Sequence, residues 1–169
     1  MKSILGVLIV LFLFTSCGIV VNYDYEKTTD FSKYKTYNYF DDMKTGLGDL
    51  DNKRLIRAID TKLKTMGLTR SDNADFYIDI QTQDIQNRTN SNVGVGVGGG
   101  GGGVSVGVPL GGHQNTRELV IEFVDDTRGG VFWQAVSESS YQPNSSPEKR
   151  EAKFVALLDK IFAGYPPKM

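Results

Sequence analysis

Residues 75–85 read Asp-Phe-Tyr-Ile-Asp-Ile-Gln-Thr-Gln-Asp-Ile, so apolar and more polar side chains alternate along the segment. Successive side chains of a β-strand point to opposite faces of a sheet, which places Phe76, Ile78 and Ile80 together on one face. Polar side chains such as Asp79 occupy the other face. The pattern is typical of an antiparallel strand with one face in the core and the other in water.

An amphipathic helix is predicted on each side of this strand in the sequence. The first spans residues 49–66, with an N-cap expected at Asp51 or Asn52 and a stop at Gly67. The second is expected to start at Ser146-Pro147, which supplies an N-cap and a proline at the first helical position. The apolar stripes of the two helices are Leu55, Ile59, Leu63 and Met66, and Phe154, Leu157, Leu158, Ile161 and Phe162.

Four further segments favour strands because they are rich in aromatic and β-branched residues. They are residues 20–25, 34–40, 116–124 and 131–136. Turn-forming residues at 125–130 predict that the last two form a hairpin. The predicted order is therefore ββαβββα, and the predicted fold class is α+β. We expect a two-layer sandwich of one mostly antiparallel sheet with both helices packed on one face.

Trp133 is expected in the second strand of that hairpin. Val131 and Trp133 share one face of the strand, whereas Phe132 and Gln134 share the other. Because Gln134 is polar, its face of the strand is expected to meet solvent, and Trp133 on the other face is predicted to point to the helices.

The N-terminus predicts export from the cytoplasm. Residues 1–16 combine a lysine, the apolar run 4–14 and small residues before Cys17, which is the pattern of a signal peptide. A helix over that run would be about 16 Å long, too short to span a bilayer. Cys17 is the only cysteine, so it cannot form an intramolecular disulfide. A buried free thiol is the alternative interpretation.

Residues 13–17, Leu-Phe-Thr-Ser-Cys, resemble a bacterial lipobox. The resemblance implies a diacylglycerol on the Cys17 thiol, cleavage before Cys17, and an acyl group such as palmitate on the new amine. Two or three acyl chains give a stable anchor, whereas one is marginal. No aspartate or acidic cluster follows the cysteine, so the implied location is the outer membrane, with residues 17–169 forming a single domain that faces the periplasm.

Residues 90–115 are predicted to form a glycine-rich mobile loop. Eleven of the 19 glycines lie between positions 94 and 112. Such a segment buries too little side chain to offset its ordering entropy. Alternating valine and glycine could instead prolong the flanking strands into a loose ribbon.

The motifs that resemble enzyme sites lack their required context. The glycine pattern at 94–99 has no helix after it, so it predicts no nucleotide site. The G-x-S-x-G match at 103–107 has only His113 near it and no acid between them, which argues against a serine hydrolase. One histidine and one lipidated cysteine leave too few ligands for a transition metal. We therefore expect no enzyme activity, cofactor or metal.

A formal net charge of −1 gives no reason to expect nucleic-acid binding. The candidate binding residues are Tyr37 and Tyr39, which share one side of a predicted strand. If that side is free of helices, it is an exposed aromatic strip that could bind a partner or a glycan. Packing in the core is the alternative.

Several motifs together resemble a known family, that of bacterial lipoproteins with a domain of unknown function numbered 4136. They lie at residues 21–25, 30–37, 66–68, 74–78, 119–125, 131–135 and 161–167, around a glycine-rich middle. The resemblance implies a lipoprotein with a compact α+β domain, and it implies no catalytic residues.

The expected function is a non-enzymatic module that binds or supports another envelope component, with the membrane as its partner through the lipid. A small-molecule or glycan-binding lipoprotein that uses the aromatic strip is the alternative. A hydrolase built on paired carboxylates is a third possibility.

Shortening residues 94–112 to a few residues is expected to leave the thermal midpoint similar or slightly raised. The reason is that closure entropy rises only slowly with loop length. Thermal denaturation followed by circular dichroism tests this. A large drop in the midpoint would show that the segment packs against the domain.

Overall fold

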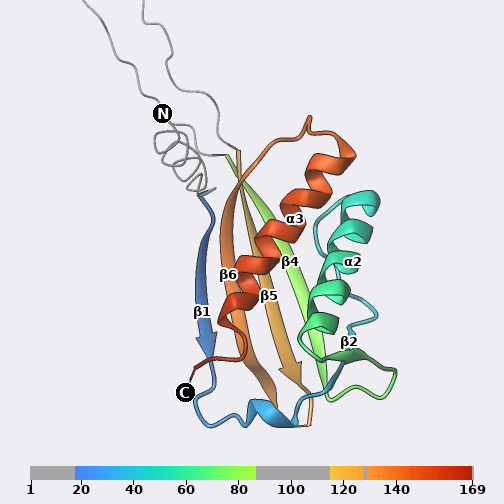
Figure 1. Cartoon of the computed structure of the whole chain (residues 1–169), viewed down its shortest axis with the longest axis vertical. Coiled ribbons are helices and arrows are strands. Elements are labelled where there is room, and N and C mark those ends of the chain that lie inside the picture. The colour runs from blue at the N-terminus through green and yellow to red at the C-terminus, as the bar shows by residue number, and fades with distance from the viewer. Residues whose placement is uncertain (1–17, 87–114, 128, 169) are drawn as a thin grey trace, which may run out of the picture.

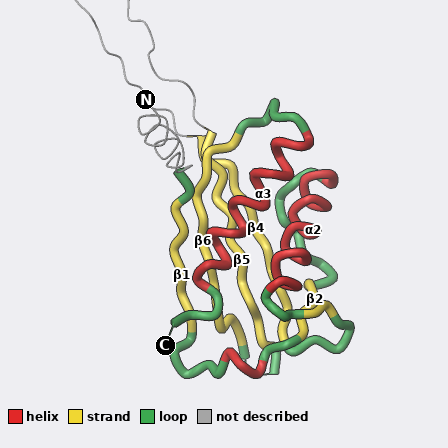
Figure 2. The backbone as a smooth tube through the Cα atoms, viewed as in Figure 1, coloured by secondary structure: helices red, strands yellow, loops and turns green. Residues whose placement is uncertain are grey.

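The computed structural model describes residues 18–86, 115–127 and 129–168. One six-stranded sheet is covered on one face by two helices (Figure 1). Figure 2 shows the long strands of the sheet running beside these helices. The elements are β1 (Val20–Tyr25), β2 (Thr36–Tyr39), α2 (Asp49–Thr65), β3 (Thr69–Arg70), β4 (Phe76–Gln86), β5 (Asn115–Asp125), β6 (Gly130–Tyr141) and α3 (Pro147–Ile161), with short 3-10 turns at Phe31–Lys33 and Phe162–Gly164. The predicted α+β two-layer class is confirmed.

The strands lie in the order β1-β6-β5-β4-β2-β3. Strands β4, β5 and β6 form a long antiparallel meander, and β1 adds antiparallel to β6. Strand β2 pairs parallel with both β4 and β3. These parallel pairs and the two-residue β3 were not predicted. They arise because α2 crosses over the sheet between β2 and β4, as parallel neighbours require.

The two helices differ in how they begin. Ser146 caps α3 as predicted, and its side chain accepts a hydrogen bond from the backbone N–H of Lys149. Gly48 is the N-cap of α2 and supplies no side chain, so the prediction of Asp51 or Asn52 there is wrong. Asp51 lies inside the first turn, where its carboxylate binds arginines instead.

The core lies between the sheet and the helices. Leu55, Ile59 and Leu63 of α2 are fully buried, as the predicted stripe requires. The sheet contributes the alternate residues Phe76, Ile78 and Ile80 of β4, Leu119, Ile121 and Phe123 of β5, and Trp133 and Ala135 of β6. Each strand therefore turns one set of side chains to the helices and the other set to solvent.

Trp133 is fully buried, as predicted. Its ring lies 4.7 Å from that of Phe123 and stacks on Phe162 at 6.0 Å between centroids. Phe132 was expected on the opposite face, yet it is only 5% exposed and stacks on Tyr34 at 4.1 Å. A register shift between Phe123 and Val124 inserts an extra residue in β6, so two successive rings enter the core.

Residues 1–17 and 87–114 lie outside the described residues. The predictions of a signal peptide, of lipid on Cys17 and of a mobile loop therefore stay predictions. Asn115, the last residue of the predicted loop, begins β5.

Trp133→Ala is expected to lower the free energy of unfolding by about 3–5 kcal/mol, because it leaves a large cavity among stacked rings. That is a large part of the stability of a small domain. Urea denaturation measures the change. Val131→Ala is the control, since Val131 is 48% exposed and its truncation should cost little. An unchanged midpoint for the tryptophan variant would contradict this packing.

Candidate functional site

The predicted aromatic strip is not on the surface. Tyr37 and Tyr39 are 2% and 7% exposed, and both rings face the helices. The parallel register places Tyr37 beside Phe76 and Tyr39 beside Ile78, so the two tyrosines share the core face of the sheet. The prediction that they form an exposed binding surface is therefore wrong.

Both tyrosines instead link β2 to α2 through hydrogen bonds. Their hydroxyls donate to the same oxygen of Asp60, at 2.9 Å from Tyr37 and 2.8 Å from Tyr39. Burial, together with the carboxylate of Asp60, raises the pKa of both phenols. The guanidinium of Arg70 lies 4.9 Å from the ring centre of Tyr39, and its Nη1 lies 3.8 Å from Oδ2 of Asp60. Both phenols thus stay protonated near neutral pH and serve as hydrogen-bond donors.

A buried ion cluster joins the N-terminal turns of the two helices. The Asp51 carboxylate accepts hydrogen bonds from Arg54 at 2.7 Å and from Arg150 at 2.5 Å. All three side chains are mostly buried. The cavity beside them, whose lining includes Tyr141 and Phe154, measures about 40 Å³. That volume holds a few water molecules at most, so this corner joins the helices and offers no room for a larger ligand.

The face of the sheet that carries no helix is distinguished by its charge. We call it the open face, and its charged side chains are Asp24, Asp79, Glu118, Glu122 and Glu138. No lysine or arginine projects from the same face of strands β1, β4, β5 and β6 within the described residues. All five carboxylates are at least partly exposed.

The strand registers arrange these carboxylates in two rows. Asp24, Gln134, Glu122 and Asp79 lie side by side across four strands. Four residues further along, Glu118 lies directly opposite Glu138. Like charges in such cross-strand positions destabilise a sheet. The arrangement therefore costs the isolated domain stability.

The hydrogen bonds on the open face leave its charge in place. The side-chain amide of Gln134 donates to Glu122 at 2.6 Å, and that of Gln81 donates to Asp79 at 2.9 Å. Neutral amides orient the carboxylates and do not cancel them. Between the two rows, Val120 lies opposite Val136 and gives the face an apolar centre.

Two hollows of the surface meet at Glu122. One, of about 320 Å³, is lined by Asp24, Glu26 and Glu122. The other, of about 630 Å³, lies beside the loop after β2 and is lined by Asp79, Glu122 and the single cation Lys44. The open face is therefore shallowly concave and acidic.

A metal site does not account for these acids. Within residues 18–86, 115–127 and 129–168, no three His, Cys, Asp or Glu side chains are grouped closely enough to hold a metal ion. The carboxylates instead spread over four strands, which suits an extended contact better than a single small ligand.

Sequence reasoning missed the open face as a candidate site. The signal was present in the alternation, since acids recur at polar positions of several predicted strands. Their alignment into rows depends on the register between strands far apart in the chain.

The start of β1 fixes where the N-terminal segment meets the domain. Only Gly18 and Ile19 separate Cys17 from Val20 at the start of β1. This end of the sheet also holds the end of β4, the start of β5 and the first turn of α3 (Figure 1). A connection of three residue steps spans about 10 Å at most.

Comparisons with known proteins give a family and a fold. The model of a family described as "Domain of unknown function (DUF4136)" matches residues 21–167. No curated protein matches the chain.

Two solved structures share the fold. A PDZ domain protein from Parabacteroides distasonis is similar with a TM-score of 0.59 and 13% identity over 89% of this chain. The match covers only 37% of that protein. A dodecamer of a PelC variant from Paraburkholderia phytofirmans is similar with a TM-score of 0.50 and 12% identity, over 86% of this chain and 96% of that one.

Glu138→Lys is expected to raise the free energy of unfolding by about 0.5–1 kcal/mol, because it turns the repulsion from Glu118 into attraction. The gain should shrink at about 1 M salt, where charges are screened within about 3 Å. Urea denaturation at low and high salt measures both effects. Asp72→Lys, in an exposed turn, changes the net charge equally and should alter stability by less than about 0.5 kcal/mol. A loss of stability in Glu138→Lys would contradict the repulsion.

Proposed function

The chain belongs to the DUF4136 family, whose model matches residues 21–167 and which has no assigned function, so we propose a role from the chain's own residues. The protein is a non-enzymatic lipoprotein, anchored through Cys17 in the outer membrane and facing the periplasm. Its domain binds or supports another envelope component through the open face. The observation that carries the binding role is the unneutralised, uncovered row of carboxylates on that face.

The lipid anchor is supported by the sequence before the domain. An apolar run of 11 residues is followed closely by the only cysteine, and β1 begins three residues after it. No helix among the described residues is long and apolar enough to cross a membrane. An acylated Cys17 would hold the end of the sheet next to α3 within about 10 Å of the lipid.

The binding role is supported by the loss of folding stability that the like charges of the open face cause. If this face only had to keep the protein soluble, positive and negative side chains could alternate on it, as they commonly do on protein surfaces. Here Glu118 and Glu138 repel each other across adjacent strands, and both hollows are lined by acids. A cationic partner would relieve this repulsion on binding, so the same residues that weaken the free domain would strengthen the complex.

A binding role fits the spread of these side chains better than catalysis does. Catalytic acids and bases need to converge within hydrogen-bonding reach of one reacting atom. Direct cross-strand neighbours occur only as the pairs Asp79–Glu122 and Glu118–Glu138, and the two pairs are four residues apart along the strands, which is about 13 Å. The glycan-binding alternative rested on Tyr37 and Tyr39, and their burial removes its surface.

Cys17→Ala is expected to leave the protein unprocessed or released from the membrane, because the only acceptor for diacylglycerol is gone. Fractionation of cells that produce either form, with separation of inner and outer membranes, measures this. Ser16→Ala is the control, since it keeps a small residue before the cysteine and should be processed normally. Outer-membrane recovery of Cys17→Ala equal to that of the native chain would refute the anchor.

A further inference from the structure

We propose that the open face binds the helical layer of a second copy of this chain, so that copies assemble head to tail. The inference rests on the proposed function in one respect, since it names the partner of the open face. The contact brings the exposed cations of α2 in one copy onto the carboxylate rows of the next.

Charge is divided unevenly between the open face and the rest of the molecule. The whole chain has 20 acidic and 19 basic residues. Among the described strands, five of the acids and none of the bases stand on the open face. Cleavage before Cys17 removes Lys2, which leaves 15 acids against 18 bases in the rest of residues 17–169. One face is thus strongly negative while the remainder is positive, and two copies can satisfy each other only with unlike surfaces in contact.

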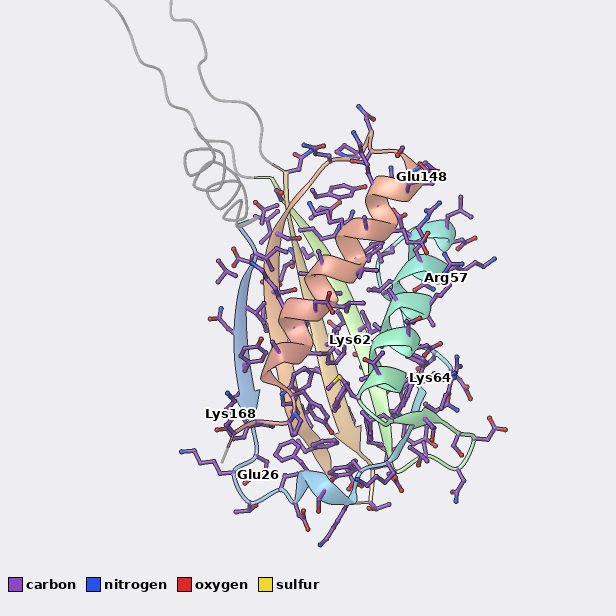
Figure 3. The ribbon with its side chains drawn as sticks, viewed as in Figure 1. Glu26, Arg57, Lys62, Lys64, Glu148 and Lys168 are labelled. Atoms are coloured by element: carbon purple, nitrogen blue, oxygen red, sulfur yellow. The ribbon has the colours of Figure 1, made fainter. Side chains whose placement is uncertain are left out.

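Helix α2 carries a cationic stripe, formed by Lys53, Arg57 and Lys64. The spacing of four and then seven residues places all three on one side of the helix. Asp60 lies on the same side, and its carboxylate is bound by Tyr37, Tyr39 and Arg70 of the same copy. All three cations of the stripe are exposed, and Figure 3 shows Arg57 and Lys64 along this helix. Arg57 pairs with Glu151 at 3.4 Å, whereas Lys53 and Lys64 have no ion-pair partner within the described residues.

The cationic stripe is about as long as the distance between the two carboxylate rows. Lys53 and Lys64 are 11 residues apart, which corresponds to about 16 Å along a helix. The two carboxylate rows are about 13 Å apart along the strands. A helix laid along the open face can therefore reach both rows at once, with Val120 and Val136 beneath its middle.

The charge pattern also decides the symmetry of the contact. Two open faces packed against each other would oppose five carboxylates with five, which excludes a twofold dimer through this face. A contact between unlike surfaces repeats from copy to copy and gives a ring or a filament. The copies stack across the sheet and not along its strands, so every β1 can begin at the same level. All Cys17 anchors can then enter one membrane.

The test uses the full-length chain, produced in one cell with two different affinity tags and extracted in mild detergent at low salt. Purification through one tag is expected to recover the other copy. Recovery should fall steeply as salt rises, because the contact is electrostatic. If native copies do not co-purify at low salt, the proposal is wrong.

Two charge-reversed chains locate the contact. Glu118→Lys with Glu138→Lys reverses the open face, and Lys53→Glu with Lys64→Glu reverses the stripe. Each variant paired with itself should co-purify at least about tenfold less than the native chain. When the two variants are produced together, each still carries one native surface, so recovery should return.

Matched controls change equal charge elsewhere. The two control variants are Asp72→Lys with Asp126→Lys, and Lys27→Glu with Lys168→Glu. These positions are exposed and lie in turns or near the end of the chain, so both variants should co-purify like the native chain. Thermal unfolding of each purified variant shows whether it is folded. Equal losses in the controls, or no recovery when the two reversed chains are combined, would overturn the proposal.

These outcomes separate the contact from the anchor. If all variants reach the outer membrane and native copies still fail to co-purify, the self-association is wrong and the lipoprotein assignment stands. If the chain is absent from the membrane but its copies co-purify, the anchor is wrong and the contact stands.

Discussion

The one-sided covering of the sheet is the constraint on which the other features depend. Both helices lie on one face, so every strand must send its apolar side chains the same way, and a slip of one residue would expose them all. This determines the inward direction of Tyr37 and Tyr39 in β2 as firmly as that of Ile78 in β4. The same rule collects the acids on the opposite face.

Much of the fold could be predicted from local patterns. The alternation in β4 and the stripe from Leu55 to Leu63 predicted the core correctly, because both periods are properties of short segments. The inward turn of Phe132 depends on a register shift against β5, a strand separated from it by a turn, and no local pattern reveals it. Tyr37 shows a different limit, since alternation says that it shares a side with Tyr39 but not which side the helices cover.

The helices are joined to each other as well as to the sheet. Arg150 of α3 and Asp51 of α2 form a mostly buried pair, whereas Lys62 and Asp159 pair at 2.6 Å in a more exposed position. Exposed pairs contribute little, while a buried carboxylate that lost its arginines would be costly. The relative position of the two helices is therefore held mainly at the end of the sheet where β1 begins, and α2 cannot shift there without breaking the cluster.

The confinement of the core to one side has a consequence for how such domains can diverge. Substitutions at the outward positions of β4, β5 and β6 remove no fully buried side chain, so they change the charge of the surface at little cost to folding. A lineage can thus retune recognition through these positions while its scaffold persists. Sequence drift should concentrate at alternate strand residues, and identities should survive where rings such as Phe123 and Trp133 meet.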